Sequence, residues 1–203
     1  MSATIKEEEM QEQILQTAKQ LFQLHGFKRV TIDDIAKAIG KARSSLYYYY
    51  KTKDEILAAV IAADIAELIT AIAFAVAQAP SAEEKVKAFF RTKLQIILEK
   101  RAFFHSLDEG MDPAELSGYQ KTKLAVHQQI RQQEGELLSQ IITESIESGE
   151  ITRLGQKDQR DLVFVLLSCL QGLKREMVIQ NDFSNIESAV EILVRSFIHG
   201  LKK

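Results

Sequence analysis

Apolar residues recur at intervals of three and four along most of this chain, which is the spacing of one face of an α-helix. Ile14, Ala18 and Leu21 show this spacing near the N-terminus, and similar stripes follow. The predicted helices span about residues 7–25, 31–39, 43–50, 52–79, 81–98, 102–109, 112–148, 158–180 and 184–201. We therefore expect an all-α fold of about nine helices.

The predicted helix ends carry residues that favour starting or stopping a helix. Thr31 can cap a helix whose first turn carries Asp33 and Asp34, and Gly26 and Gly40 suit helix stops. The 203 residues include only 9 Gly and 2 Pro, and 46% of them are apolar. Such a composition indicates a globular, helix-rich protein.

The single cysteine, Cys169, rules out an internal disulfide and fits a reducing cytoplasm. No secretory signal is visible near the N-terminus. The apolar run of residues 56–79 is a candidate membrane span, but it contains Asp64 and Glu67. Each carboxylate would cost on the order of 3 kcal/mol near mid-bilayer. We therefore expect a buried helix, no membrane partner and a cytoplasmic location.

Positive charge is concentrated in one segment of an otherwise acidic chain. Seven Lys or Arg and two Asp lie between Gly26 and Lys53, so this segment carries +5, whereas the whole chain has a net charge of −2. A local basic patch is typical of binding to a polyanion. On charge alone, the alternative is a run of charged residues that is exposed to solvent and binds nothing.

Two short helices joined at residues 39–42 have the proportions of a helix-turn-helix. At about 100° per residue, Leu46 and Tyr50 face inward together on the second helix. The outward arc carries the pairs Arg43 with Tyr47, Ser44 with Tyr48, and Ser45 with Tyr49. A guanidinium, hydroxyls and phenols suit base edges and phosphates, so this arc is a candidate DNA-reading surface.

The same segment resembles the DNA-binding head of the TetR family of transcriptional regulators. Residues 26–57 read GFKRVTIDDIAKAIGKARSSLYYYYKTKDEIL. The shared positions are Gly26, Phe27, Thr31, Asp34, Ile35, Ala36, Gly40, Leu46, Tyr47, Tyr48, Tyr50 and Lys53. The resemblance covers about residues 12–60, and the later helices are compatible with the family's ligand-binding domain.

The resemblance implies a role for each polar residue of this segment. Thr31 and Lys53 would bind backbone phosphates. The residues in the major groove would be Arg43, Ser44, Ser45 and Tyr47. Those at phosphates or sugar edges would be Tyr48 and Tyr49.

Three positions depart from the family's pattern. Lys41 stands where an apolar residue is usual, and we expect it to extend towards a phosphate. Ala42 replaces a Ser or Thr cap, which costs roughly 0.5–2 kcal/mol. Ser44 replaces a common glycine. The second helix of the helix-turn-helix, residues 43–50, is the recognition helix. We therefore expect it to start irregularly, or to become ordered at its start only on DNA.

The last two predicted helices suggest a homodimer. The helix over residues 158–180 is apolar nearly all round between Leu162 and Leu170, so it needs cover on two sides. A partner subunit would supply one side; the alternative is that both sides face the chain's own core. The candidate interface residues are Phe164, Ser168, Gly172, Ile186, Val190, Leu193, Val194 and Phe197. A two-fold dimer would bind a palindromic operator.

The middle helices are where the resemblance implies a pocket for a small-molecule effector. The candidate lining residues are Phe89, Phe90, Phe103, Phe104, Met111, Tyr119 and His127. Apolar residues at this spacing can equally be plain core. His105, Asp108, Glu109 and Asp112 could ligate a metal, but their spacing is loose, so we expect no metal and no cofactor.

Together these features predict a ligand-responsive transcriptional regulator, most simply a repressor released from its operator by an effector. Residues 7–53 would form the DNA-binding domain, continuing into the next helix, and residues 54–203 the ligand-binding and dimerisation domain. An enzyme is not expected, because no phosphate-binding glycine loop, nucleophile elbow, HExxH or CxxC motif is present. The other alternative is a helical nucleoid organiser or adaptor without a sensor.

Overall fold

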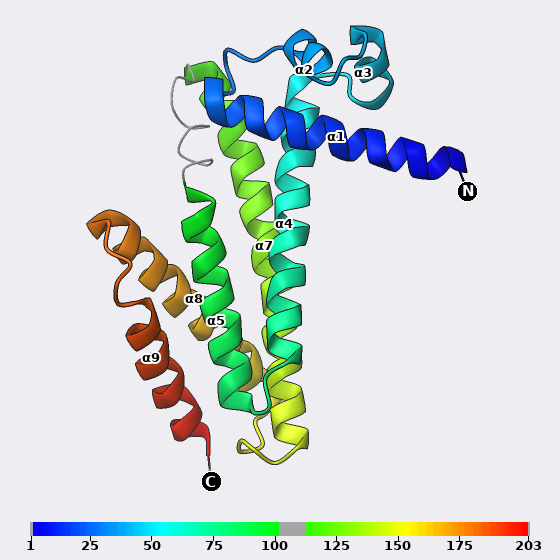
Figure 1. Cartoon of the computed structure of the whole chain (residues 1–203). Helices are drawn as coiled ribbons and strands as arrows, with labels where there is room; N and C mark the ends of the chain where they lie inside the picture. Colours follow the sequence, from blue (N-terminus) through cyan, green and yellow to red (C-terminus); the bar gives the residue numbers. More distant parts are fainter. Residues whose placement is uncertain (1, 102–112, 203) are drawn as a thin grey trace. The chain divides into compact units, whose positions relative to one another are not determined.

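The computed structural model describes residues 2–101 and 113–202, with side chains for residues 6–101 and 125–202, and every regular element in these ranges is an α-helix (Figure 1). The helices are α1 (Ser2–His25), α2 (Ile32–Ala38), α3 (Arg43–Tyr49), α4 (Lys53–Ala77), α5 (Ala82–Glu99), α7 (Pro113–Glu147), α8 (Gln156–Gln180) and α9 (Ile186–Leu201). The all-α prediction is confirmed. The predicted helix over residues 102–109 lies outside the described residues.

Two glycines end α1 and α2 because they adopt backbone angles that other residues rarely adopt. Gly26 has φ +78° and Gly40 has φ +66°. The amide of Gly26 donates to the Phe22 carbonyl at 2.9 Å, which closes the last turn of α1. A left-handed residue directly after a helix redirects the chain, and glycine does so without a Cβ clash. Both predicted helix stops are therefore confirmed.

The chain divides into two compact units. The first comprises Met1–Ala66 together with Glu99–Val126, and the second comprises Glu67–Leu98 together with His127–Lys203. Helices α4 and α7 each contribute residues to both units. The division by function at residue 53 stays a prediction.

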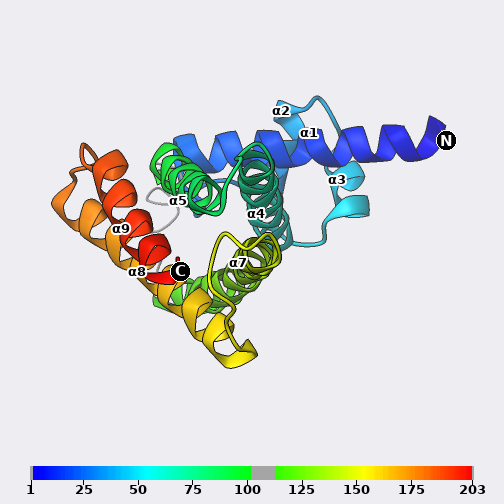
Figure 2. The same cartoon turned by 90° about the horizontal axis from the view of Figure 1, so that it is seen from below.

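The second unit is built around an apolar core to which α4, α5, α7, α8 and α9 all contribute. Figure 1 and Figure 2 both show α8 and α9 side by side at the C-terminal end of the chain. The fully buried side chains of this core include Ile72, Phe89, Phe90, Leu138, Leu170, Val190 and Val194.

Helix α4 is long and apolar enough to cross a membrane by length and composition, with 44% of its most apolar window buried.

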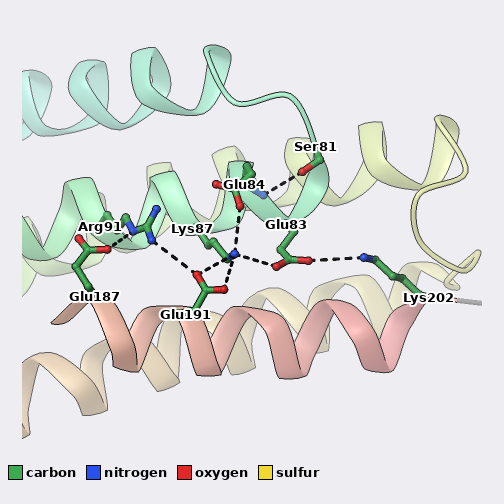
Figure 3. Close-up of polar contacts among 8 residues, drawn as sticks. All are labelled: Ser81, Glu83, Glu84, Lys87, Arg91, Glu187, Glu191 and Lys202. Atoms are coloured by element: carbon green, nitrogen blue, oxygen red, sulfur yellow. Dashed lines mark hydrogen bonds and ion pairs between the residues drawn. The ribbon is translucent and has the colours of Figure 1, made fainter. Parts of the chain in front are cut away.

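A network of charged side chains joins α9 to α5 at the edge of this core (Figure 3). The Lys87 ammonium lies 2.9 Å from Glu83 on its own helix and 2.9 Å from Glu191 of α9. Arg91 reaches Glu187 of α9 at 2.6 Å. The hydrogen bonds that Lys87 donates to Glu83 and Glu191 raise the pKa of Lys87, so this lysine stays charged. The network therefore fixes the position of α9 on α5.

Candidate functional site

The helices of the first unit position α3 through a small apolar core. Helix α1 packs on α2, and α2 packs on α3. Phe22 of α1 and Phe27 of the following turn meet edge to face, with ring centroids 5.2 Å apart. Leu46 of α3 is fully buried and Tyr50 is half-buried, as predicted for the inward face of this helix. The opposite arc of α3 faces solvent.

A complete capping box starts α2. The Thr31 hydroxyl accepts from the Asp34 amide at 3.2 Å, and the Asp34 carboxylate accepts from the Thr31 amide at 2.9 Å. The same carboxylate accepts from the Thr31 hydroxyl at 2.7 Å. The hydrogen bonds from Thr31 hold the pKa of Asp34 below its ordinary value. The Thr31 hydroxyl therefore donates within the protein here, and it would have to turn to donate to a phosphate.

Helix α3 starts without a side-chain cap. Ala42 occupies the N-cap in an extended conformation, with φ −72° and ψ 147°, and its side chain accepts no hydrogen bond. The Ser45 amide donates to the Ala42 carbonyl at 3.0 Å, which closes the first turn. The first turn of α3 is therefore closed by the backbone, without the side-chain hydrogen bond that a Ser or Thr cap would add.

Arg43 is held in place by its neighbours on the outward arc. Its guanidinium donates to the Tyr47 hydroxyl at 2.7 Å and to the Asp33 carboxylate of α2 at 3.1 Å. The guanidinium also lies over the Tyr47 ring, 5.2 Å from its centroid. The hydrogen bond that Arg43 donates to Tyr47 and the charge of Asp33 raise the pKa of Arg43, so the guanidinium stays charged. Its side chain is still 59% exposed and available to a ligand.

The remaining predicted DNA-contacting residues of this segment differ in exposure. Lys41, Ser44 and Ser45 are exposed, whereas Tyr47 and Tyr49 are half-buried. Tyr48 is 69% exposed, and its ring meets Tyr49 edge to face with centroids 5.0 Å apart. A hydrogen bond to the Glu7 carboxylate of α1 raises the pKa of the Tyr48 hydroxyl. These side chains give α3 an aromatic and hydroxyl-rich surface.

Lys53, at the first position of α4, binds the turn that follows α1. Its ammonium donates to the Phe27 carbonyl at 2.8 Å and lies 4.2 Å from the centre of the Phe27 ring. The ammonium also reaches the Lys28 carbonyl at 3.4 Å. Lys53 therefore joins the start of α4 to this turn, and its predicted phosphate contact remains a prediction.

Three of the predicted effector-binding residues, Phe89, Phe90 and His127, have side chains that the structure describes. Phe89 and Phe90 are fully buried in the core of the second unit, and their ring centroids lie 6.1 Å apart. His127 is exposed on α7. Tyr119 belongs to α7, but its side chain lies outside the described residues, as do Phe103, Phe104 and Met111 entirely.

A small cavity lies in the second unit, between the start of α5, the end of α7, α8 and α9. Its volume is about 10 Å³, which is room for about one water molecule. Its lining includes Val86, Ile142, Leu166 and Phe197. No group of three or more His, Cys, Asp or Glu able to hold a metal occurs among the described residues, and the cluster around His105 lies outside them.

The sequence analysis missed a buried ion pair between α5 and α7. The Lys93 ammonium lies 2.5 Å from the Glu134 carboxylate, and the two side chains are 2% and 1% exposed. Burial lowers the pKa of Lys93. The second carboxylate oxygen of Glu134 and the side-chain amide oxygen of Gln133 are buried and accept no hydrogen bond. The signal for this pair was present in the sequence. Glu134 lies one helical turn before Leu138, so it places a charge on the apolar stripe of α7.

The candidate dimer residues fall into two groups. Phe164 is 62% exposed, Gly172 is exposed, and Ser168 is half-buried between them on α8. Val190 and Val194 are fully buried in the chain's own core, whereas Ile186, Leu193 and Phe197 are half-buried against it. Further exposed apolar side chains on the same two helices are Val165, Val178, Ile179 and Ile192. The apolar surface that remains for a partner is therefore largely on α8.

Residues 14–60 match the sequence model described as "Bacterial regulatory proteins, tetR family". The chain is 26% identical over 156 residues to the "Fatty acid metabolism regulator protein" of Bacillus subtilis, an alignment that covers 75% of this chain and 76% of that one.

Solved structures share the fold at lower identity. A TetR transcription regulator from Haloarcula marismortui has a TM-score of 0.73 at 21% identity, covering 97% of this chain and 100% of the other. A structure described as a fatty acid metabolism regulator from Clostridium perfringens has a TM-score of 0.61 at 20% identity, covering 94% of this chain and 99% of the other.

Proposed function

The chain belongs to the tetR family of bacterial regulatory proteins through residues 14–60, and from this premise we propose that it is a repressor released from DNA by a small molecule. It would act in the cytoplasm and bind a palindromic operator as a homodimer. An apolar effector would lower its affinity for that operator. The observation that carries this proposal is the solvent-facing arc of α3, which combines Arg43 with exposed serines and tyrosines.

The proposed DNA contacts follow from the chemistry of the head. In the major groove, where Arg pairs with guanine, the residues facing base edges would be Arg43, Ser44, Ser45 and Tyr47. The residues that contact phosphates or sugars would be Thr31, Lys41, Tyr48, Tyr49 and Lys53. The +5 charge of residues 26–53 would release condensed counterions, so affinity should fall steeply with salt.

The proposed dimer uses the exposed side of α8. Phe164 is a large apolar side chain with 62% of its surface in solvent, and Gly172 allows a partner helix to approach closely. Burying such an apolar surface is favourable because it is removed from water. In a two-fold dimer each subunit presents the same patch to the other, so the contact buries both copies. Two recognition helices related by a two-fold axis would then read half-sites about one helical turn apart.

The proposed effector site lies within the helices of the second unit. Phe89 and Phe90 of this unit would supply apolar contacts, and His127 a polar one. The Lys93–Glu134 pair adds a buried polar group whose second carboxylate oxygen lacks a donor. The relative from Bacillus subtilis is described as a fatty acid metabolism regulator, so acyl compounds are the first class to test.

The test is to select DNA from a random pool with the purified protein and then to screen compounds for release. We expect enrichment of a pseudo-palindrome and its release by a fatty acid or an acyl thioester. Non-specific binding with no enriched sequence would favour the organiser alternative. Enrichment without release by any compound of a broad metabolite panel would contradict the sensing half of the proposal.

A further inference from the structure

A buried carboxylate in the first unit joins α1, α4 and the residue that follows α5. Asp64 of α4 is 7% exposed, and one of its oxygens, Oδ1, is shared by two lysines. The Lys19 ammonium of α1 lies 2.5 Å from this oxygen, and the Lys100 ammonium lies 2.8 Å from it. Asp64 occupies the buried stripe of α4, one turn after Val60 and one turn before Leu68. A charge at such a position is costly unless it is paired.

The two lysines belong to segments with different surroundings. Lys19 is on α1, the helix that packs on α2 and thereby supports α3. Lys100 directly follows Glu99, the last residue of α5. Helix α5 also carries Phe89 and Phe90, which are fully buried in the core of the second unit. A shift of α5 is consequently passed to Lys100 through the covalent chain.

The geometry of Asp64 allows such a shift to change the contacts of α1. Its second oxygen, Oδ2, is buried and accepts no hydrogen bond. The Lys100 ammonium can therefore move from Oδ1 to Oδ2 without a new charge being buried. The Lys19 ammonium would then no longer share Oδ1, and its preferred distance from Asp64 would change. The two oxygens of Asp64 would thus offer Lys100 two alternative positions, and coupling between distant elements requires an element with two arrangements.

We propose that Asp64 is the positioning residue through which α5 and α1 sense each other's position, so that effector binding near α5 is transmitted to the recognition helix. This inference rests on the proposed function, because it needs a DNA-bound and a DNA-free state. By linkage, operator DNA bound at α3 must also act back on α5. That reciprocal effect can be measured with the operator alone, before any effector is identified.

The experiment is hydrogen exchange of the last six residues of α5, residues 94–99, with and without the selected operator duplex. In the wild-type protein, the operator should slow exchange there by about 5-fold or more. Lys100→Met should abolish this slowing, and Lys100→Arg should restore it. The matched control is Lys85→Met, which breaks a 2.7 Å ion pair with Glu144 on another part of α5 and should leave the slowing intact.

A second measurement uses the two lysines and leaves Asp64 in place. Lys19→Met, Lys100→Met and the double variant form a cycle read out as operator affinity. Coupling through the shared oxygen should make their effects non-additive by about 2-fold or more in Kd. Unchanged exchange in the wild-type protein, or additive effects, would overturn the inference while leaving operator binding intact. Failure to enrich any operator would instead overturn the proposed function.

Discussion

Arg43 and Tyr47, one turn apart on α3, are joined by a 2.7 Å hydrogen bond from the guanidinium to the phenol. The contact holds an exposed arginine in a fixed direction before any ligand arrives. Pre-organisation of this kind reduces the entropy that binding must overcome. The pair is therefore the natural place to test whether α3 reads DNA, as proposed.

Arg43→Ala should relax the base preference of the protein. Losing one bidentate base contact costs about 1–3 kcal/mol, which is roughly 5- to 150-fold in affinity for the preferred site. Tyr47→Phe should have a smaller effect, because it removes one hydroxyl and frees the guanidinium from its hydrogen bond but keeps the proposed Arg43 base contact. The measurement is competition between the selected operator and its single-base variants. Wild-type preference in the Arg43 variant would show that α3 is not the reading helix.

Lys53→Ala should weaken binding to all DNA sequences alike. The slope of log affinity against log salt should fall by about 1, as expected for one lost phosphate contact. The variant should also lose stability, by about 1.5–3 kcal/mol, because Lys53 bonds the Phe27 carbonyl. Salt titrations measure the first effect and urea unfolding the second. Loss of stability with an unchanged salt slope would leave Lys53 a structural role only.

Phe164→Asp should convert the protein to monomers at micromolar concentration. Its side chain is 62% exposed in the single chain, so the change should spare the fold but place an unpaired charge in the proposed interface. Phe74→Asp is the matched control, because Phe74 of α4 is 67% exposed and lies outside the proposed face. Light scattering after size-exclusion chromatography measures the mass. Phe164→Asp dimers as stable as wild type would place the interface elsewhere.

Lys93→Met should destabilise the second unit by about 3–5 kcal/mol, because it leaves the Glu134 carboxylate buried without a counter-charge. The double variant Lys93→Met with Glu134→Leu should recover most of this loss. Urea unfolding measures both. Recovery of stability with loss of the effector response would assign the pair to ligand binding, whereas recovery of both stability and response would make it a packing feature.

Glu83→Gln should matter most near neutral pH. The hydrogen bond from Lys87 holds the pKa of Glu83 below its ordinary value of 4.5. A depressed carboxyl pKa adds stability that is complete above the ordinary value and is lost as the pH falls through the folded one. The stability difference between wild type and variant should therefore shrink below about pH 4.5. In a Lys87→Met background this pH dependence should disappear, and its persistence would assign it to another partner.

The sequence alone determined the helices and the head of this protein. Apolar spacing marked the helical segments, Gly26 and Gly40 marked two ends, and Thr31 with Asp34 marked the start of α2. These signals are local, because they arise from backbone angles and hydrogen bonds within a few residues. The outward arc of α3 was likewise readable, since α3 is short and its face is set by helical geometry.

Only the tertiary structure decided which polar residues meet across the core. Asp64 was visible as a charge in an apolar helix, but its two lysines lie 45 and 36 residues away along the chain. Lys93 and Glu134 are separated by 41 residues. The inward burial of Val190 and Val194, both proposed from their apolar stripe as interface residues, was equally hidden. A stripe shows that a helix face is covered, and only packing shows whether the chain itself provides the cover.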